Sequence, residues 1–116
     1  MPITEIDIEI IVDHDTQDIG TVTTVPVPTQ SQPITLLWTI VGGTLDSSDG
    51  ITLNSPNPAI SSLTRISETQ WSAIDTNNSE SSQGSIGYTI HFFPNATQSG
   101  DVRRRDPVID NQPPPG

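Results

Sequence analysis

The sequence contains no cysteine and no lysine, and each absence excludes a class of chemistry. Without cysteine the chain forms no disulfide, offers no thiol nucleophile and cannot build a cysteine-ligated zinc site. Without lysine it cannot form a Schiff base, a P-loop phosphate site or a Lys-to-Asn isopeptide bond. Long apolar runs are missing too, since none approaches the roughly 18 residues of a membrane-spanning helix.

Positive charge is scarce as well. The 116 residues carry four arginines against 14 Asp and Glu, which gives a formal net charge of −10. Because such an acidic chain repels phosphate backbones and anionic lipid, we expect neither nucleic acid nor a membrane as a partner. The first residues, Met1 to Glu5, lack the basic and apolar regions of a secretory signal, so we expect a soluble, cytoplasmic protein.

Aromatic residues make up only 4% of the chain, but β-branched residues are abundant. Leu, Ile, Val and Phe together number 29 of the 116 residues, a share above the ~20% that is typical of disordered chains. Isoleucine is the commonest of them, and its branching at Cβ suits a pleated sheet better than a helix. No segment has the 3.6-residue apolar period of an amphipathic helix, so we expect an all-β protein.

The spacing of apolar residues predicts where the strands lie. The clearest alternation is in residues 4–10, where three isoleucines face one way and three acids the other (Ile6, Ile8 and Ile10; Glu5, Asp7 and Glu9). Other extended segments are expected at 19–27, 33–41, 51–53, 59–66, 70–74, 85–93 and 102–109. Short strands with turn residues between them are typical of an antiparallel, Ig-like β-sandwich, here of about seven or eight strands.

Further features refine this prediction. Pro26 cannot donate a ladder hydrogen bond, so the strand that contains it is predicted to lie at an edge or to leave the sheet there. Segment 33–41 is the most apolar and is predicted to be a central strand covered on both faces. The core should contain the large aromatic side chains Trp38, Trp71 and Tyr88.

The domain organisation is predicted to be simple. Residues 1–110 should form a single sandwich, and the Pro-rich residues 111–116 an extended or frayed tail. Within the sandwich, residues 75–84 have too few apolar groups to pack, so this loop is predicted to be the most mobile internal segment.

A group of three aspartates, Asp13, Asp15 and Asp18, is the best metal candidate, because carboxylates clustered in one loop suit calcium. Their spacing lacks the glycine and the final glutamate of an EF-hand, so turn formation and strand capping are the alternative interpretation. The two histidines, His14 and His91, lie in no nucleophile motif such as G-x-S-x-G, and we expect no enzyme. His91 is predicted to face solvent from its strand.

A lone basic cluster, Arg103, Arg104 and Arg105, follows near the end of the chain. Adjacent side chains of an extended segment point to alternate faces, so at least one arginine must meet a partner or a carboxylate. The predicted counterpart is the acidic face of Glu5, Asp7 and Glu9, either within the chain or between subunits. Between subunits this salt-sensitive contact would drive self-assembly into an oligomer, filament or inclusion.

Two short segments resemble a known family. The start of the first strand and its acidic turn, residues 6–15 (IDIEIIVDHD), resemble the opening of bacterial inclusion-body proteins of the PixA/AidA kind. Residues 106–109 (DPVI) resemble the Asp-Pro-x-Ile element that closes the same family. The resemblance implies a non-enzymatic, cytoplasmic protein that accumulates and self-associates. A calcium- or carbohydrate-binding module is the alternative function.

Overall fold

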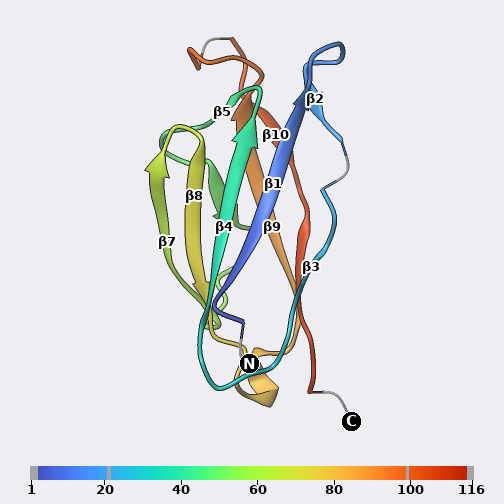
Figure 1. Cartoon of the computed structure of the whole chain (residues 1–116), viewed down its shortest axis with the longest axis vertical. Coiled ribbons are helices and arrows are strands. Elements are labelled where there is room, and N and C mark those ends of the chain that lie inside the picture. Colours follow the sequence, from blue (N-terminus) through green and yellow to red (C-terminus); the bar gives the residue numbers. More distant parts are fainter. Residues whose placement is uncertain (1–2, 21, 99, 115–116) are drawn as a thin grey trace.

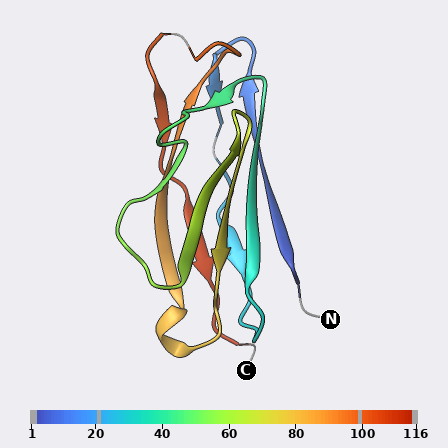
Figure 2. The ribbon, with the colours of Figure 1, turned by 90° about the vertical axis from the view of Figure 1, so that its left-hand side faces the viewer.

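The computed structural model describes residues 3–20, 22–98 and 100–114, and it shows two β-sheets packed face to face (Figures 1 and 2). The first sheet contains β1 (Glu5–Asp13), β2 (Asp18–Ile19), β4 (Ile34–Val41), β7 (Ile60–Ser67) and β8 (Gln70–Asp75). The second contains β3 (Val25–Val27), β5 (Thr44–Leu45), β6 (Ile51–Leu53), β9 (Gly84–Phe93), β10 (Arg103–Arg105) and β11 (Val108–Asn111). A short 3-10 helix, η1 (Glu80–Ser82), precedes β9, and no described helix is long and apolar enough to cross a membrane.

The strand order confirms the predicted all-β sandwich. In the first sheet the order is β2-β1-β4-β8-β7, and in the second β9 pairs with β6 and β11. The set β1-β4-β8-β7 opposite β6-β9-β11 corresponds to the order ABED opposite CFG of Ig-like sandwiches. Two pairs, β1 with β4 and β3 with β11, are parallel, so both sheets of the sandwich are mixed rather than purely antiparallel. The strands of each pair are distant along the chain and are not joined by a hairpin, so they can pair in either the parallel or the antiparallel direction.

The number of strands is larger than the seven or eight predicted, because β5 was not expected and because two expected segments, 19–27 and 102–109, each divide into two strands. Segment 19–27 also has its two halves in different sheets. Its start, β2, pairs with β1 of the first sheet, and its end, β3, pairs with β11 of the second. Pro26 lies exposed in β3 at the edge of that sheet, as predicted from its missing N–H. The chain thus crosses from one layer to the other between Ile19 and Val25.

The predicted aromatic core is confirmed. Trp38, Trp71 and Tyr88 are all buried. The Trp38 indole Nε1–H donates to the Tyr88 hydroxyl at 3.1 Å, and the two ring centroids are 5.4 Å apart. Burial raises the pKa of Tyr88 to about 12, because the phenolate form would lose its hydration. The pair therefore fills the core while it satisfies its polar atoms.

The most apolar strand, β4, is central in its sheet, as predicted, but only one of its faces is fully buried. Its core face carries Ile34, Leu36, Trp38 and Ile40. The residues between them, Thr35, Leu37 and Thr39, are half-buried on the outer face. The expectation of cover on both faces is wrong, since each sheet of a sandwich packs against a single partner layer.

Two segments that were expected to be loose are held by polar contacts. The loop at 75–84 contains η1, and its side chains Asp75, Asn77 and Ser82 are buried. The expected tail begins inside β11, where Asn111 is fully buried and the N–H of Gln112 donates to the Val27 carbonyl at 2.8 Å. The ordered sandwich thus extends past the predicted boundary at 110, whereas residues 1–2 and 115–116 lie outside the described residues.

Candidate functional site

The outer edge of β1 has an unpaired stretch. On one side β1 pairs with β4 from Glu5 to Ile11, whereas on the other side it pairs with β2 only at Val12 and Asp13. Along this second side, no strand of the described chain pairs with residues 5–11. A long free edge is a template on which another strand can add.

The backbone groups at this edge can be identified from the register. The N–H of Thr35 donates to the Thr4 carbonyl at 2.9 Å, so the polar groups of Thr4 face β4. These groups alternate in direction along a strand, and those of Ile6, Ile8 and Ile10 therefore face β4 as well. The N–H and C=O groups of Asp7 and Glu9 consequently point to the free edge.

A groove of about 440 Å³ runs beside the free edge. One wall is β1, and the other is formed by residues 19–20 and 22–26, which lead into β3 beside β1 in Figure 1. The groove is lined mainly by aliphatic side chains: Ile6, Ile8, Ile10, Ile19, Val22 and Val25. We call the free edge of residues 5–11 together with this groove the β1 groove.

Other sheet edges in the described structure are obstructed. β3 carries Pro26. β7 is interrupted by two register shifts, between Ser61 and Thr64 and between Arg65 and Ser67. Strands β5, β6 and β10 are each three residues or shorter. Prolines, bulges and short strands are the usual means by which sheets prevent unwanted pairing, and the free edge of β1 has none of them.

The three acids predicted as an interface lie beside the β1 groove. Glu5, Asp7 and Glu9 alternate with the core residues of β1, and all three are exposed on the outer face of the sheet. A side-chain hydrogen bond with Asp7 and the negative charge of Asp7 raise the pKa of Glu5. Within the described residues no arginine forms an ion pair with any of the three.

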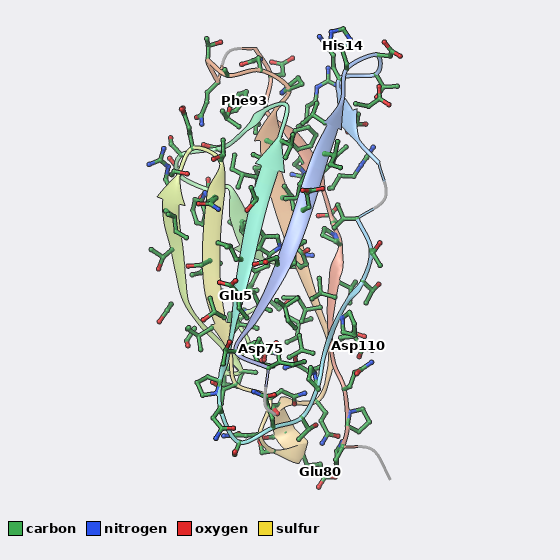
Figure 3. The ribbon with its side chains drawn as sticks, viewed as in Figure 1. Glu5, His14, Asp75, Glu80, Phe93 and Asp110 are labelled. Atoms are coloured by element: carbon green, nitrogen blue, oxygen red, sulfur yellow. The ribbon has the colours of Figure 1, made fainter. Side chains whose placement is uncertain are left out.

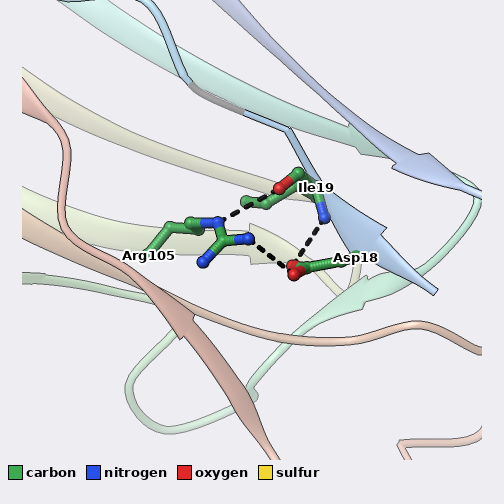
Figure 4. A network of polar contacts seen from close by, with 3 residues as sticks. All are labelled: Asp18, Ile19 and Arg105. Atoms are coloured by element: carbon green, nitrogen blue, oxygen red, sulfur yellow. Dashed lines mark hydrogen bonds and ion pairs between the residues drawn. The ribbon is translucent and has the colours of Figure 1, made fainter. Parts of the chain in front are cut away.

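The predicted arginine cluster is divided in its contacts. Arg105 donates from Nη2 to Asp18 Oδ2 at 2.5 Å and from Nε to the Ile19 carbonyl at 3.1 Å (Figure 4). The carboxylate that Arg105 finds is thus on β2, and the expectation that β1 supplies it within the chain is wrong for this residue. Arg103 and Arg104 are exposed, and no ion pair is found for them in the described part of the chain.

The aspartates predicted as metal ligands serve other contacts. Asp13 Oδ1 accepts the N–H groups of Asp15 at 2.8 Å and Thr16 at 3.1 Å, which caps the turn after β1. Asp18 binds Arg105, and Asp15 lies 3.6 Å from the exposed His14 at the tip of this turn (Figure 3). No three acidic or histidine side chains of the described residues gather into a group that could hold a metal ion.

His91, predicted to face solvent, is half-buried on β9 next to Arg104 of β10. Its ring Nδ1 is buried and has no hydrogen-bond partner in the part of the chain that the structure describes. The prediction of a solvent-facing sheet position did not include Arg104, which pairs with His91 on the neighbouring strand.

A buried polar cluster at the opposite end of the sandwich was not predicted. Asn111 Nδ2 donates to Asp75 Oδ1 and to the Ser82 carbonyl, both at 2.9 Å. Asn77 Nδ2 donates to the carbonyls of Val27 and Gln112 at 3.0 and 2.9 Å. The cluster therefore joins β3, β8, η1 and β11. The sequence gives no signal for it, because a run rich in Asp, Asn and Ser has the composition of an exposed loop.

Comparisons with protein-family models, with curated proteins and with solved structures find no match for this chain. The resemblance of residues 6–15 and 106–109 to inclusion-body proteins therefore stays a prediction. Function is inferred from the β1 groove and from the charges around it.

Proposed function

We propose that this protein is non-enzymatic and works through protein–protein contacts, by adding a strand of another polypeptide at the β1 groove. The observation that carries the proposal is the free edge of residues 5–11 beside an aliphatic groove. In strand addition, main-chain hydrogen bonds supply affinity, and alternate side chains in pockets supply specificity. The β1 groove offers both.

The gain on binding comes from two sources. The edge groups of Asp7 and Glu9 would exchange water for a partner's backbone, at a net ~1 kcal/mol for each hydrogen bond. The half-buried Ile6 and Val22 would lose their remaining contact with water, at about 25 cal/mol per Å² of apolar surface. Together these terms favour an extended segment over a folded surface, since only a strand reaches both the edge and the groove.

A neutral heptapeptide of alternating threonine and valine tests this function. Its addition should slow the hydrogen exchange of the Asp7 and Glu9 amides and shift the amide resonances of residues 5–11 and 22–26. The variant Glu9→Pro lacks the edge N–H at position 9 but leaves the pairing with β4 intact, and it should weaken binding about tenfold. Glu9→Ala keeps the N–H and serves as the control. Unchanged exchange at millimolar peptide contradicts the proposal.

Self-assembly is the second candidate, and the exposed arginines favour it. Arg103 and Arg104 of one copy can meet Glu5, Asp7 and Glu9 of the next copy. Such a contact is head-to-tail, so it grows into a filament unless the rotation closes a ring. Light scattering after size-exclusion chromatography should show assembly at low salt and its loss at high salt or in Arg103→Ser/Arg104→Ser. A strict monomer at both salt concentrations overturns this candidate.

A further inference from the structure

We propose that the segment accepted by the β1 groove comes from a different protein and alternates arginine or lysine with valine, isoleucine or leucine. This inference rests on the proposed function, because it specifies the partner of the same site. The length of the segment follows from the free edge, which runs from residue 5 to residue 11.

The basic positions follow from the exposed acids. Residues directly opposite each other in paired strands share a face of the sheet, so the residues that pair with Asp7 and Glu9 stand beside their carboxylates. These acids have no ion pair within the described chain, and Arg105 is occupied by Asp18. Opposite charges across the new pair stabilise it, whereas acidic residues at these positions repel.

The aliphatic positions follow from the groove. Every second residue of the added strand points inward, on the face of Ile6, Ile8 and Ile10. There it meets Val22 and Val25, which line the opposite wall. A polar side chain at these positions would lose water without gaining a partner, so the inward residues must be apolar.

No described segment of the chain itself has this pattern. A second copy of β1 in antiparallel register about Ile8 would place Asp7 opposite Glu9 of that copy, and like charges directly opposite destabilise a sheet. Residues 103–105 are three consecutive arginines, so at least one of them would face the aliphatic wall. Pro113 and Pro114 lack the N–H groups that pairing requires. The occupant is therefore a different polypeptide.

The test compares three heptapeptides that alternate valine with arginine, threonine or glutamate, titrated by calorimetry and amide shifts. The arginine peptide should bind at least tenfold more tightly than the threonine peptide at low salt, and 0.5 M NaCl should remove the difference. The variant Asp7→Arg/Glu9→Arg should reverse the preference and select the glutamate peptide. The control Asp49→Arg/Glu68→Arg makes the same charge change at exposed positions of other segments and should keep the original preference.

The outcomes separate the two proposals. If all three peptides perturb residues 5–11 and bind equally well, strand addition stands and the basic pattern is overturned. If none of them perturbs the β1 groove, both proposals fail. A preference for the arginine peptide that persists in Asp7→Arg/Glu9→Arg also overturns the assignment, because the attraction then arises from the overall charge rather than from β1.

Discussion

At the residue scale, protonation of Asp75 provides a second hydrogen bond between the buried side chains of Asp75 and Asn111. Asn111 Nδ2 donates to Asp75 Oδ1, whereas Asp75 Oδ2 and Asn111 Oδ1 are both buried and have no hydrogen-bond partner among the described residues. A protonated Asp75 can donate from Oδ2 to Asn111 Oδ1, which satisfies both oxygens at once. Burial raises the pKa of Asp75 to about 6, although the hydrogen bond from Asn111 opposes this shift.

The described neighbours of Asp75 add no charge to this pair. Its backbone neighbours are Ile34 on β4 and Ile60 on β7, and Ser82 reaches the pair from η1 through its carbonyl. None of these residues titrates. Two acids of neighbouring elements, Asp110 of β11 and Glu80 of η1, are labelled in Figure 3, and both are drawn apart from Asp75.

The pair makes stability depend on pH. An unfolded aspartate has a pKa of about 3.9, so the folded protein holds the Asp75 proton more tightly. Its contribution is therefore fully present below about pH 4 and is lost as the pH rises through about 6. Asp75→Asn supplies a permanent N–H donor and should stabilise the protein at pH 8 by ~1–2 kcal/mol. Urea unfolding at pH 5 and pH 8 measures this, with the exposed Asp101→Asn as control. A loss of stability at pH 8 would contradict the assigned pairing.

Tyr88 gives a second prediction at this scale. Replacing it with phenylalanine removes the hydroxyl that accepts the buried Trp38 N–H and leaves that donor without a partner. Tyr88→Phe should therefore destabilise the protein by ~1–3 kcal/mol despite the small change in volume. The double variant Tyr88→Phe/Trp38→Phe removes both polar groups and serves to separate this loss from the effect of packing. Equal stability of Tyr88→Phe and the parent protein would rule out the hydrogen bond as a significant contribution.

At the scale of elements, β1 should show an alternating pattern of exchange. The amides of Ile8 and Ile10 face β4 and should exchange slowly, whereas those of Asp7 and Glu9 face the free edge and should exchange at least a hundredfold faster. Exchange measured by NMR on the unbound protein checks this directly. Uniform protection along residues 5–11 would mean that another strand already covers the edge in solution.

The contact between Arg105 and Asp18 joins elements of the two layers, since β10 belongs to one sheet and β2 to the other. Both side chains are partly exposed, so Arg105→Ala should cost only about 1 kcal/mol or less of stability. Its local effect should be larger: the amide of Ile19 should exchange faster, because β2 loses its tie to β10. Arg104→Ala removes an exposed arginine without an ion pair and is the matched control.

The elements also show what the sequence could and could not predict. The alternation in residues 4–10 predicted β1 and its acidic face correctly, because a strand with one buried face alternates apolar and polar residues. The crossing of the chain after Ile19 was not predicted. Both ends of the expected strand 19–27 contain apolar residues typical of a strand, so the pattern gives no sign that they belong to different sheets. The packing of the loop at 75–84 was missed because its buried groups are polar. The free edge itself depends on pairing between distant strands, which local patterns do not encode.

At the scale of the whole molecule, the net negative charge affects whether two copies of the chain associate. The net charge of −10 produces a general repulsion between copies, and Glu5, Asp7 and Glu9 concentrate that repulsion at the free edge. In acid the raised pKa of Glu5 favours its neutral form, which weakens this repulsion, and the β1 edges of two copies can then pair. Light scattering should detect dimers at pH 3 that Glu9→Pro abolishes. If Glu9→Pro forms dimers at pH 3 as readily as the parent protein, the dimer contact is not at the β1 edge.

The parallel pairing of β3 with β11 sets the order of events during folding. Val25 pairs with Ile109, and Val27 pairs with Asn111. During synthesis β3 therefore cannot pair until β11, which lies about 80 residues later in the sequence, has been made. Closing so long a loop is slow, because the chain loses conformational entropy before the stabilising contacts between the two strands form. Until β11 arrives, Asn77 has neither the Gln112 carbonyl nor a settled Val27 carbonyl to bind. The second sheet therefore stays incomplete until β11 has been synthesised, and until then its apolar residues are available for a chaperone to bind.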